Sequence, residues 1–267
     1  MLSIARKKQG MENQLLIIIL ILAAAIVIFI VLTKYITSTN ANGEIEICKL
    51  SVVTQSATEI KPGMTGWKSP LDLNCAKRYI NFYDTKVEQG MSPENTKPLT
   101  IDYDGKKVTK FNGLSDMVVD QVVAEELRIC KYQFGDGKID IFPNNEKLFE
   151  GQKVCFVCSE INFKPTVQKQ IFSNLVDYTK KTTYAKAGKT YYNYLTEKTI
   201  YDNPMWDQPT LPGDKPLSNL NFDKSKPYLV FVEKYSRSTV DVLQKEGIWI
   251  IIAPASDINN YCDVIAN

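Results

Sequence analysis

The sequence predicts an α+β fold class: one N-terminal transmembrane helix followed by a disulfide-reinforced, mixed α/β domain outside the cytoplasm. Three observations predict it. A single apolar stretch near the N-terminus is long enough to cross a bilayer, all six cysteines follow that stretch, and the rest of the chain carries both helical and strand-like patterns of apolar residues. We therefore expect a basic cytoplasmic leader over residues 1–14, a membrane helix over 15–34, a linker over 35–43 and the outer domain over 44–267.

The apolar stretch is an unbroken run of eighteen uncharged residues from Leu15 to Leu32. A helix needs roughly 20 apolar residues to cross the hydrocarbon core of a bilayer. Three basic residues at positions 6–8 precede the run and a single Lys34 follows it, and basic residues stay on the cytoplasmic side. The pattern predicts a single-pass protein of the cell membrane with its N-terminus in the cytoplasm. A cleaved secretory signal is the alternative, but its apolar core is usually only about 7–15 residues long.

The 267 residues carry a formal charge of +2, from 32 basic and 30 acidic residues. The first 43 residues hold four basic residues and one acidic residue, which leaves the outer domain with 28 basic and 29 acidic residues. A domain with a net charge of −1 is not expected to bind nucleic acid. The chain has no histidine, which excludes Ser-His-Asp and Cys-His catalysis and metal ligation by imidazole. Because it also shows no cofactor or metal motif, we expect a non-enzymatic protein without a cofactor.

The six cysteines all fall in the predicted outer domain, where oxidising surroundings favour disulfides. An even number predicts up to three bonds, and the sequence leaves all 15 pairings open. A bond to the last cysteine would tie the C-terminal region back to the body of the domain. The candidates are Cys48, Cys75, Cys130, Cys155, Cys158 and Cys262.

Cys155 and Cys158 form the one CxxC motif of the chain, inside a segment rich in β-forming residues. Side chains alternate between the two faces of a strand, so we expect these cysteines on opposite faces, bonded to different partners. Cys130 lies on the apolar side of a predicted helix and suits a bond to this strand. A redox site and a metal site are the alternatives; they require, respectively, a thiol exposed at a helix N-terminus and a second CxxC.

The first half of the outer domain is predicted to consist of two strands separated by loops. Residues 44–53 begin with alternating apolar and polar residues and predict a strand. Residues 61–66 contain one proline and two glycines and predict a loop. A second strand is predicted over 71–83, with Cys75 inside it, followed by a loop over 90–98.

The clearest helix is predicted from Ser115 to Phe134. Ser115 can cap its N-terminus, and Gly135 can end it in a left-handed conformation. Apolar residues recur at helical spacing along the segment, at Val119, Val123, Leu127, Cys130 and Phe134. A second helix is predicted over 166–180, directly after a proline.

The C-terminal part combines an irregular segment with two strands. Residues 201–227 contain five prolines and predict irregular structure. Apolar runs over 228–233 and 248–253 predict strands, with a short helix over 238–245 between them. Strand, helix and strand in this order favour a parallel pair joined by a crossover helix.

Aromatic and positively charged residues alternate over 178–201, which holds six tyrosines and five lysines. Such residues can stack on the sugars of a glycan or on single-stranded nucleic acid while the lysines meet anionic groups, so this segment predicts a ligand or partner surface. The candidate residues are Tyr184, Tyr191, Tyr192, Tyr194, Lys186 and Lys189, together with Trp206 from the irregular segment. The alternative is structural: Tyr191 and Tyr194 pack with Leu195 on the core, the lysines are solvated, and Trp206 pins the long loop.

The basic segment RKKQG at positions 6–10 is followed by Met11, Glu12 and the apolar run. This arrangement resembles the leader of type IV pilin-like surface proteins, particularly archaeal ones. The resemblance implies cleavage after Gly10, so that Met11 begins the mature chain and the apolar helix packs into a filament core. The polar segment 38–43 predicts that this helix stops there. The outer domain resembles only uncharacterised surface proteins of small archaea, which implies no activity.

Together these patterns predict a membrane-anchored cell-surface protein whose outer domain binds a partner or scaffolds an assembly without catalysis. The expected partners are the lipid bilayer and either another protein or a second copy of the chain. One alternative is a subunit of a pilin-like filament. A second alternative is a thiol–disulfide oxidoreductase that uses Cys155 and Cys158.

Overall fold

The computed structural model describes residues 41–58, 73, 75–103, 105–139, 152–184, 188–199, 221–235 and 247–266. Among these residues, no helix is long and apolar enough to cross a membrane. The chain divides into two compact units, Met1–Glu44 and Ile45–Asn267, and nearly all of the described residues belong to the second unit.

Several sequence predictions lie outside the described residues. They are the leader with Gly10 and Met11, the membrane helix over 15–34, the loop over 61–66, the helix over 238–245 and the side chains of Lys186 and Trp206.

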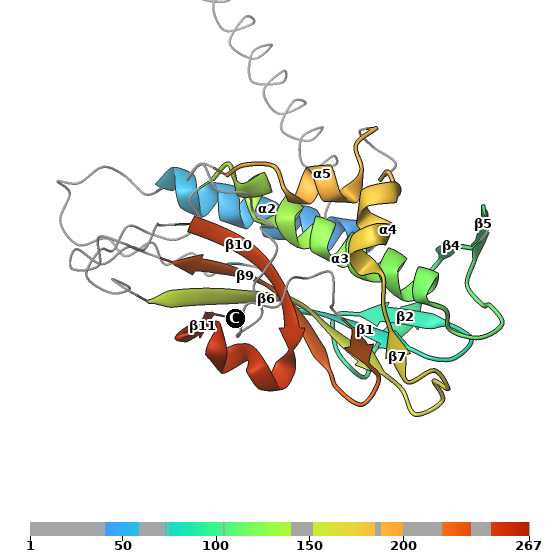
Figure 1. Ribbon diagram of the computed structural model, residues 1–267. Helices are drawn as coiled ribbons and strands as arrows, with labels where there is room; N and C mark the ends of the chain where they lie inside the picture. Colours follow the sequence, from blue (N-terminus) through green and yellow to red (C-terminus); the bar gives the residue numbers. More distant parts are fainter. Residues whose placement is uncertain are drawn as a thin grey trace, which may run out of the picture. The chain divides into compact units, whose positions relative to one another are not determined.

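The second unit is built on a seven-stranded sheet with the order β10-β9-β6-β1-β2-β3, and β11 also pairs with β6 (Figure 1). The strands are β1 (Arg78–Phe82), β2 (Val87–Gly90), β3 (Thr96–Pro98), β6 (Lys153–Phe163), β9 (Tyr228–Tyr235), β10 (Gly247–Pro254) and β11 (Val264–Ala266). Two separate two-stranded sheets join β4 (Ile101–Tyr103) to β5 (Lys106–Val108) and β7 (Ile171–Phe172) to β8 (Phe222–Asp223).

The central strand β6 pairs with a single strand along its first edge and with two different strands along its second edge. Along the first edge it pairs antiparallel with β9, with a register shift between Val157 and Ser159. Along the second edge β11 pairs parallel with residues 154–156, and β1 pairs parallel with residues 159–163. Val157 and Cys158 therefore fall between the end of one strand partner and the start of the next, which leaves a break in the sheet at that point.

The α-helices lie along one face of the large sheet (Figure 1). They are α2 (Ala41–Thr58), α3 (Asp116–Gln133), α4 (Leu175–Lys181) and α5 (Tyr191–Leu195). The apolar side of α3 is fully buried against the sheet, and its neighbours in the core come from β1, β6, β9 and β10. A smaller apolar cluster covers the opposite face, where the short helix η3 (Ala255–Asn260) and the segment after it pack on β9 and β10.

The prediction of α3 is confirmed. Ser115 holds the N-cap position, although its hydroxyl makes no capping hydrogen bond. Gly135 follows the helix with a φ of +68°, and the side chain of Ile139 occupies the space that a Cβ would need. The strands over 228–233 and 248–253 are also confirmed, as β9 and β10.

The predicted strand over 44–53 is wrong, because this segment belongs to helix α2. Ile45, Cys48 and Val52 are its buried residues, and their spacing of three and four is helical rather than alternating. The predicted linker over 35–43 also fails at its end, since α2 begins at Ala41 and includes Gly43. The brief alternation at the start of the segment fits both periods, and packing on α3 selects the helix.

Three other boundaries differ from the predictions. Residues 71–83 contain a strand only over β1, and Cys75 precedes it. The predicted loop over 90–98 ends in strand β3, which pairs with β2. Of the helix predicted over 166–180, only α4 is helical. Asn174, directly before α4, adopts a left-handed conformation with a φ of +86°, which interrupts the helix. The segment before Asn174 contains the short strand β7 instead of helical turns.

The predicted parallel arrangement of the last two strands is wrong. β9 and β10 form an antiparallel ladder of eight residue pairs, from Gly247 opposite Tyr235 to Pro254 opposite Tyr228. The two strands are therefore direct neighbours of opposite direction, and not the parallel pair that was predicted. Both strands read as continuous apolar runs because helices cover one face and the smaller apolar cluster covers the other.

Candidate functional site

The tyrosines of the predicted binding surface lie where α5 packs on α3. Tyr191 and Tyr194 are buried, and Leu195 beside them is fully buried. Tyr184 and Tyr192 are half-buried and pack against the main core. This placement of Tyr191, Tyr194 and Leu195 matches the alternative prediction, in which these residues hold α5 on the core.

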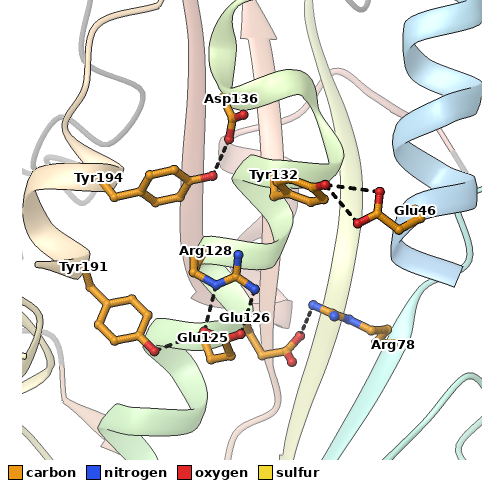
Figure 2. Close-up of polar contacts among 9 residues, drawn as sticks. All are labelled: Glu46, Arg78, Glu125, Glu126, Arg128, Tyr132, Asp136, Tyr191 and Tyr194. Atoms are coloured by element: carbon orange, nitrogen blue, oxygen red, sulfur yellow. Dashed lines mark hydrogen bonds and ion pairs between the residues drawn. The ribbon is translucent and has the colours of Figure 1, made fainter. Parts of the chain in front are cut away.

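The two buried tyrosines donate their hydroxyls to carboxylates at α3 (Figure 2). Tyr191 Oη donates to Glu125 Oε2 at 3.0 Å, and Tyr194 Oη donates to Asp136. Burial raises the pKa of both phenols, and the neighbouring carboxylates raise it further. Both side chains therefore remain neutral hydrogen-bond donors and act as anchors for α5.

The rest of the predicted surface is largely paired. Arg128 lies over the ring of Tyr184 at 5.7 Å and also forms two hydrogen bonds of 2.8 Å with Glu125. Lys180 lies over the ring of Tyr192 at 5.2 Å. Lys189 is exposed and forms an ion pair with the carboxylate of Glu197. Among the described residues of this surface, Lys180 and Lys189 are exposed, and Tyr184 and Tyr192 are half-buried.

A buried lysine of α3 also holds α5, through hydrogen bonds to backbone carbonyls of that helix. Lys131 on α3 is fully buried, and its ammonium donates to the carbonyl oxygen of Tyr194 at 2.5 Å and to that of Leu195 at 3.5 Å. These carbonyls belong to the last turn of α5, where Lys131 adds a donor to the backbone N–H of Glu197 that reaches the Tyr194 oxygen at 3.4 Å. Burial lowers the pKa of Lys131 to about 8, so the ammonium is the prevailing form at neutral pH.

The other side of α3 holds α2 through a tyrosine and a lysine. Tyr132 Oη donates to the two oxygens of Glu46 at 2.9 and 3.1 Å (Figure 2). Lys49 lies 3.4 Å from the centre of the Tyr132 ring and 3.8 Å from Asp136 Oδ2. Asp136 thus meets groups from both α2 and α5, and the C-terminal end of α3 is the point where these helices are joined.

One ion pair lies fully inside the domain, between β1 and α3. Arg78 Nη2 donates to Glu126 Oε2 at 2.5 Å, and the two side chains are 1% and 3% exposed (Figure 2). Burial raises the pKa of Glu126, and the charge of Arg78 opposes that shift. Within the described part of the chain, Arg78 Nε and Nη1 have no hydrogen-bond partner. The pair therefore fixes how β1 sits against α3 and leaves part of its hydrogen-bonding capacity unused.

A second buried carboxyl, Asp120, lies near the start of α3. Its side chain is buried, and burial together with the charge of Asp116 raises its pKa to about 8. Asp116 is already engaged by Lys169 Nζ at 2.6 Å and by the backbone N–H of Ser173 at 3.1 Å. Among the described residues, Asp120 Oδ1 has no hydrogen-bond partner. Asp120 is therefore largely protonated at neutral pH in the folded protein.

Replacing Asp120 with asparagine is expected to stabilise the domain at pH 8 by on the order of 2 kcal/mol. The folded-state pKa lies above the unfolded value, so the folded protein holds this proton across the interval from about pH 4 to pH 8 and the wild-type stability falls as the pH rises through it. The gain should therefore grow from pH 4 to pH 8, as measured by denaturant unfolding at each pH. Asp177→Asn, at an exposed position on α4, is the matched control; a gain that does not vary with pH would contradict the assignment.

All six cysteines form disulfides, which confirms the predicted count. Cys48 bonds to Cys75, Cys130 bonds to Cys158, and Cys155 bonds to Cys262. As predicted, Cys155 and Cys158 point to opposite faces of β6, since each belongs to a different apolar cluster. Because each has a distant partner, the two do not form the mutual disulfide of a redox CxxC site. Within the described ranges, no cluster of cysteine and carboxylate side chains is placed to hold a metal ion.

A cleft of about 360 Å³ opens at the break in the sheet. It lies between the residues ahead of β1, the middle of β6 and the C-terminal end of α3. The described residues that line it are Cys75, Ala76, Lys77, Tyr79, Gln133, Phe134, Phe156, Val157 and Cys158. Two of the three disulfides therefore contribute one cysteine each to the lining of this cleft, and the other described lining residues are a mixture of apolar and polar ones.

Lys77 is the charged residue of the cleft lining. Its ammonium donates to Glu160 Oε2 at 2.7 Å and lies 4.7 Å from the centre of the Tyr79 ring. Burial, the largest single influence, lowers the pKa of Lys77, but the hydrogen bonds and charges of Glu160 and Tyr79 together outweigh it and raise the pKa above its ordinary value. Burial likewise opposes the charge of Glu160, and Lys77 outweighs it, so the pKa of this carboxyl is lowered. Both groups are charged at neutral pH.

The buried charged residues of the domain were not predicted from the sequence. Glu126 stands at helical spacing between Val122 and Ile129, inside an apolar row of α3, and this is the signal that could have found it. Asp120 interrupts the apolar stripe in the same way. Glu233 lies in an apolar strand, and burial, together with the charge of Asp263, raises its pKa to about 7.

The chain was compared with protein families, curated proteins and solved structures, and none of them matches it.

Proposed function

We propose that this chain is a surface protein, held by a single N-terminal membrane helix, whose disulfide-bonded domain serves outside the cytoplasm as a binding or scaffolding module without catalysis. The observation that carries the proposal is the complete pairing of the six cysteines. Structural disulfides persist in oxidising compartments and are rare in the cytosol. The apolar run before the domain and the basic residues ahead of it supply the predicted anchor and its orientation.

The position of the cross-links supports a scaffolding role. Cys48–Cys75 joins α2, the helix that follows the predicted anchor, to the segment that leads into β1. Cys130–Cys158 joins α3 to the central strand, and Cys155–Cys262 joins that strand to the C-terminal region. A force applied at the anchor therefore passes to the sheet through a covalent bond, in addition to the packing of Ile45 and Val52.

The redox state of the cysteines in cells tests this proposal. Cells that make the full chain are quenched in acid, alkylated, and examined by peptide mass spectrometry before and after reduction. We expect the four cysteines of Cys130–Cys158 and Cys155–Cys262 to be protected before reduction, and a C-terminal tag to be removed by protease added to intact cells. Free thiols at all four positions, with a protected tag, would place the domain in the cytoplasm and end the proposal.

A pilin-like filament subunit is the second candidate function, and one observation favours it. The polar segment 38–43 was expected to end the helix that follows the leader, yet α2 begins at Ala41 and continues through Gly43 to Thr58. Helical structure is therefore present directly after the position of the expected break. Mass spectrometry of the mature N-terminus decides between the candidates: a chain beginning at Met11 supports the filament subunit, and an intact Met1 contradicts it.

We infer that partner contact, if it uses the tyrosine-rich segment, takes place at Tyr192 and Lys180 with part of Tyr184. Tyr192→Ala is expected to weaken binding to a glycan array at least about threefold, a loss typical of one aromatic contact at a partly exposed position. Tyr191→Phe is the matched control, because it removes only a hydroxyl that faces Glu125. Equal binding by Tyr192→Ala and wild type in a folded protein would remove this surface from consideration.

A further inference from the structure

We propose that Cys48–Cys75 is the thiol-exchangeable disulfide of this domain, and that a thiolate entering the cleft attacks it at Cys75 Sγ. Cys75 is half-buried and lines the cleft. The other five cysteines are all buried, between 0% and 6% exposed. This inference goes beyond the proposed scaffolding function, because it distinguishes one cross-link that can be opened from two that are permanent.

The sheet break explains why this bond differs from the other two. Cys75 precedes β1, and within the described residues no strand pairs with it beside the stretch of β6 that lacks a partner. Cys158 lines the same cleft, but it is only 4% exposed and its partner Cys130 lies on the buried side of α3. Cys155 and Cys262 belong to the apolar cluster on the opposite face. Among the six cysteines, Cys75 is therefore the one that combines partial exposure with a position in the lining of the cleft.

The lining of the cleft suits an anionic sulfur nucleophile carried on an apolar group. Lys77 lies two positions after Cys75 in the chain and also lines the cleft, and its ammonium attracts the incoming thiolate, since cationic side chains stabilise thiolates. Phe134, Phe156 and Val157 offer an apolar wall to the rest of the attacking molecule. Glu160 neutralises part of the charge of Lys77 but lies outside the described lining of the cleft.

The exchange proceeds in two balanced steps. In the first, an external thiolate forms a bond to Cys75 Sγ, the bond between the two cysteines breaks, and Cys48 leaves as a thiolate that takes up a proton. In the second, another thiolate of the reductant attacks the external sulfur of this mixed disulfide and releases Cys75 as a thiolate. The reductant loses two electrons and becomes a disulfide, while Cys48 and Cys75 become thiols.

Opening this bond loosens α2 without detaching it. Cys48 is 1% exposed, and burial in apolar surroundings disfavours its thiolate, so the first step reverses unless a second thiol completes the reaction. Ile45 and Val52 stay in the core, and Tyr132 still holds Glu46. The expected result of reduction is a domain with an intact sheet and a more mobile α2.

Graded reduction of the full chain in detergent micelles tests the proposal. The protein is exposed to increasing concentrations of dithiothreitol, trapped with an alkylating reagent, and mapped by peptide mass spectrometry. We expect Cys48 and Cys75 to be labelled together, at a rate at least about tenfold above that of the other four cysteines. Earlier opening of either other bond, or opening of all three at one rate, overturns the proposal.

A charge variant tests the role of the cleft in this reaction. Lys77→Gln is expected to slow the opening of Cys48–Cys75 by about threefold to tenfold at low salt, with a smaller effect at high salt. Lys97→Gln, at an exposed position on β3 outside the cleft lining, is the matched control and should leave the rate unchanged. Equal rates for the two variants show that the thiolate does not pass Lys77 and contradict the proposed approach.

The identity of the attacking sulfur is found from the trapped mixed disulfide. One arm uses reduced glutathione, and the other uses a CxxC oxidoreductase whose second cysteine has been replaced, which prevents completion of the reaction. Attachment at Cys75 in either arm supports the proposal, and the arm that reacts faster identifies a small thiol or a protein as the source. Attachment at Cys48, or at any cysteine of the other two bonds, overturns it.

Discussion

Replacing Arg78 with methionine is expected to lower the free energy of unfolding by about 3–5 kcal/mol, the usual cost of leaving one member of a buried ion pair alone. Methionine keeps much of the volume of the arginine stem, so the loss comes mainly from Glu126, which would be left inside the domain without its cation. Equilibrium unfolding in denaturant, followed by tryptophan fluorescence, measures the change at constant pH.

The double variant Arg78→Met with Glu126→Leu provides the control. It removes both charges and replaces them with apolar groups, so its stability should return to within about 1 kcal/mol of the wild type or exceed it. The single variant should also lose less stability at pH 5 than at pH 8. Its unpaired Glu126 carries a folded-state pKa above the unfolded value, so the folded protein holds the extra proton and is favoured as the pH falls. Equal losses in the single and double variants would show that packing, not charge, sets the effect.

The sequence predicts correctly those helices and strands in which the apolar residues follow a single pattern over the whole length of the element. The apolar residues of α3 recur over its full length, and residues 228–232 of β9 and 248–253 of β10 are uninterrupted apolar runs in strands covered on both faces. The strand prediction for residues 44–53 is wrong because the first residues of the segment alternate between apolar and polar, as in a strand. The three buried residues are spaced as in a helix, and the contacts with α3 show which of the two patterns applies. Asn174 shows a second limit, since a single left-handed residue ends a helical pattern that extends further in the sequence.

Strand direction and cysteine pairing depend on topology, which local patterns do not contain. A bond from Cys130 to the strand of the CxxC motif could be predicted, because Cys130 lies on the apolar face of its helix. Which cysteine of the motif forms that bond depends on how β6 is placed against its neighbouring strands, and this decides for Cys158. The partner of Glu126 lies 48 residues earlier in the chain, on β1. The apolar row around Glu126 predicts that the carboxylate is buried, while the identity of its cation comes only from the parallel pairing of β1 with β6.

Removal of the Cys155–Cys262 bond is expected to cost more stability than removal of either other disulfide. The bond closes a segment of 107 residues, whereas Cys48–Cys75 and Cys130–Cys158 close segments of 27 and 28 residues. In the chain-entropy description a loop of roughly 100 residues contributes about 4.7 kcal/mol, and a loop near 28 residues contributes about 1 kcal/mol less. The loops of Cys155–Cys262 and Cys130–Cys158 overlap only over residues 155–158, so their contributions should be nearly independent.

Paired alanine replacements of each disulfide, compared in the same denaturant series, measure this order. If the bond acts on the unfolded chain, Cys155→Ala with Cys262→Ala should also raise the m-value, because the released chain exposes more surface when it unfolds. If the bond acts through native packing instead, the m-value stays constant and the losses follow burial. Comparison of the two short loops separates an effect of loop closure from an effect of burial. Cys48–Cys75 closes a loop as short as that of Cys130–Cys158, but its Cys75 is only half-buried. Equal losses for these two short loops, both smaller than the loss for the long one, are the outcome that loop closure requires.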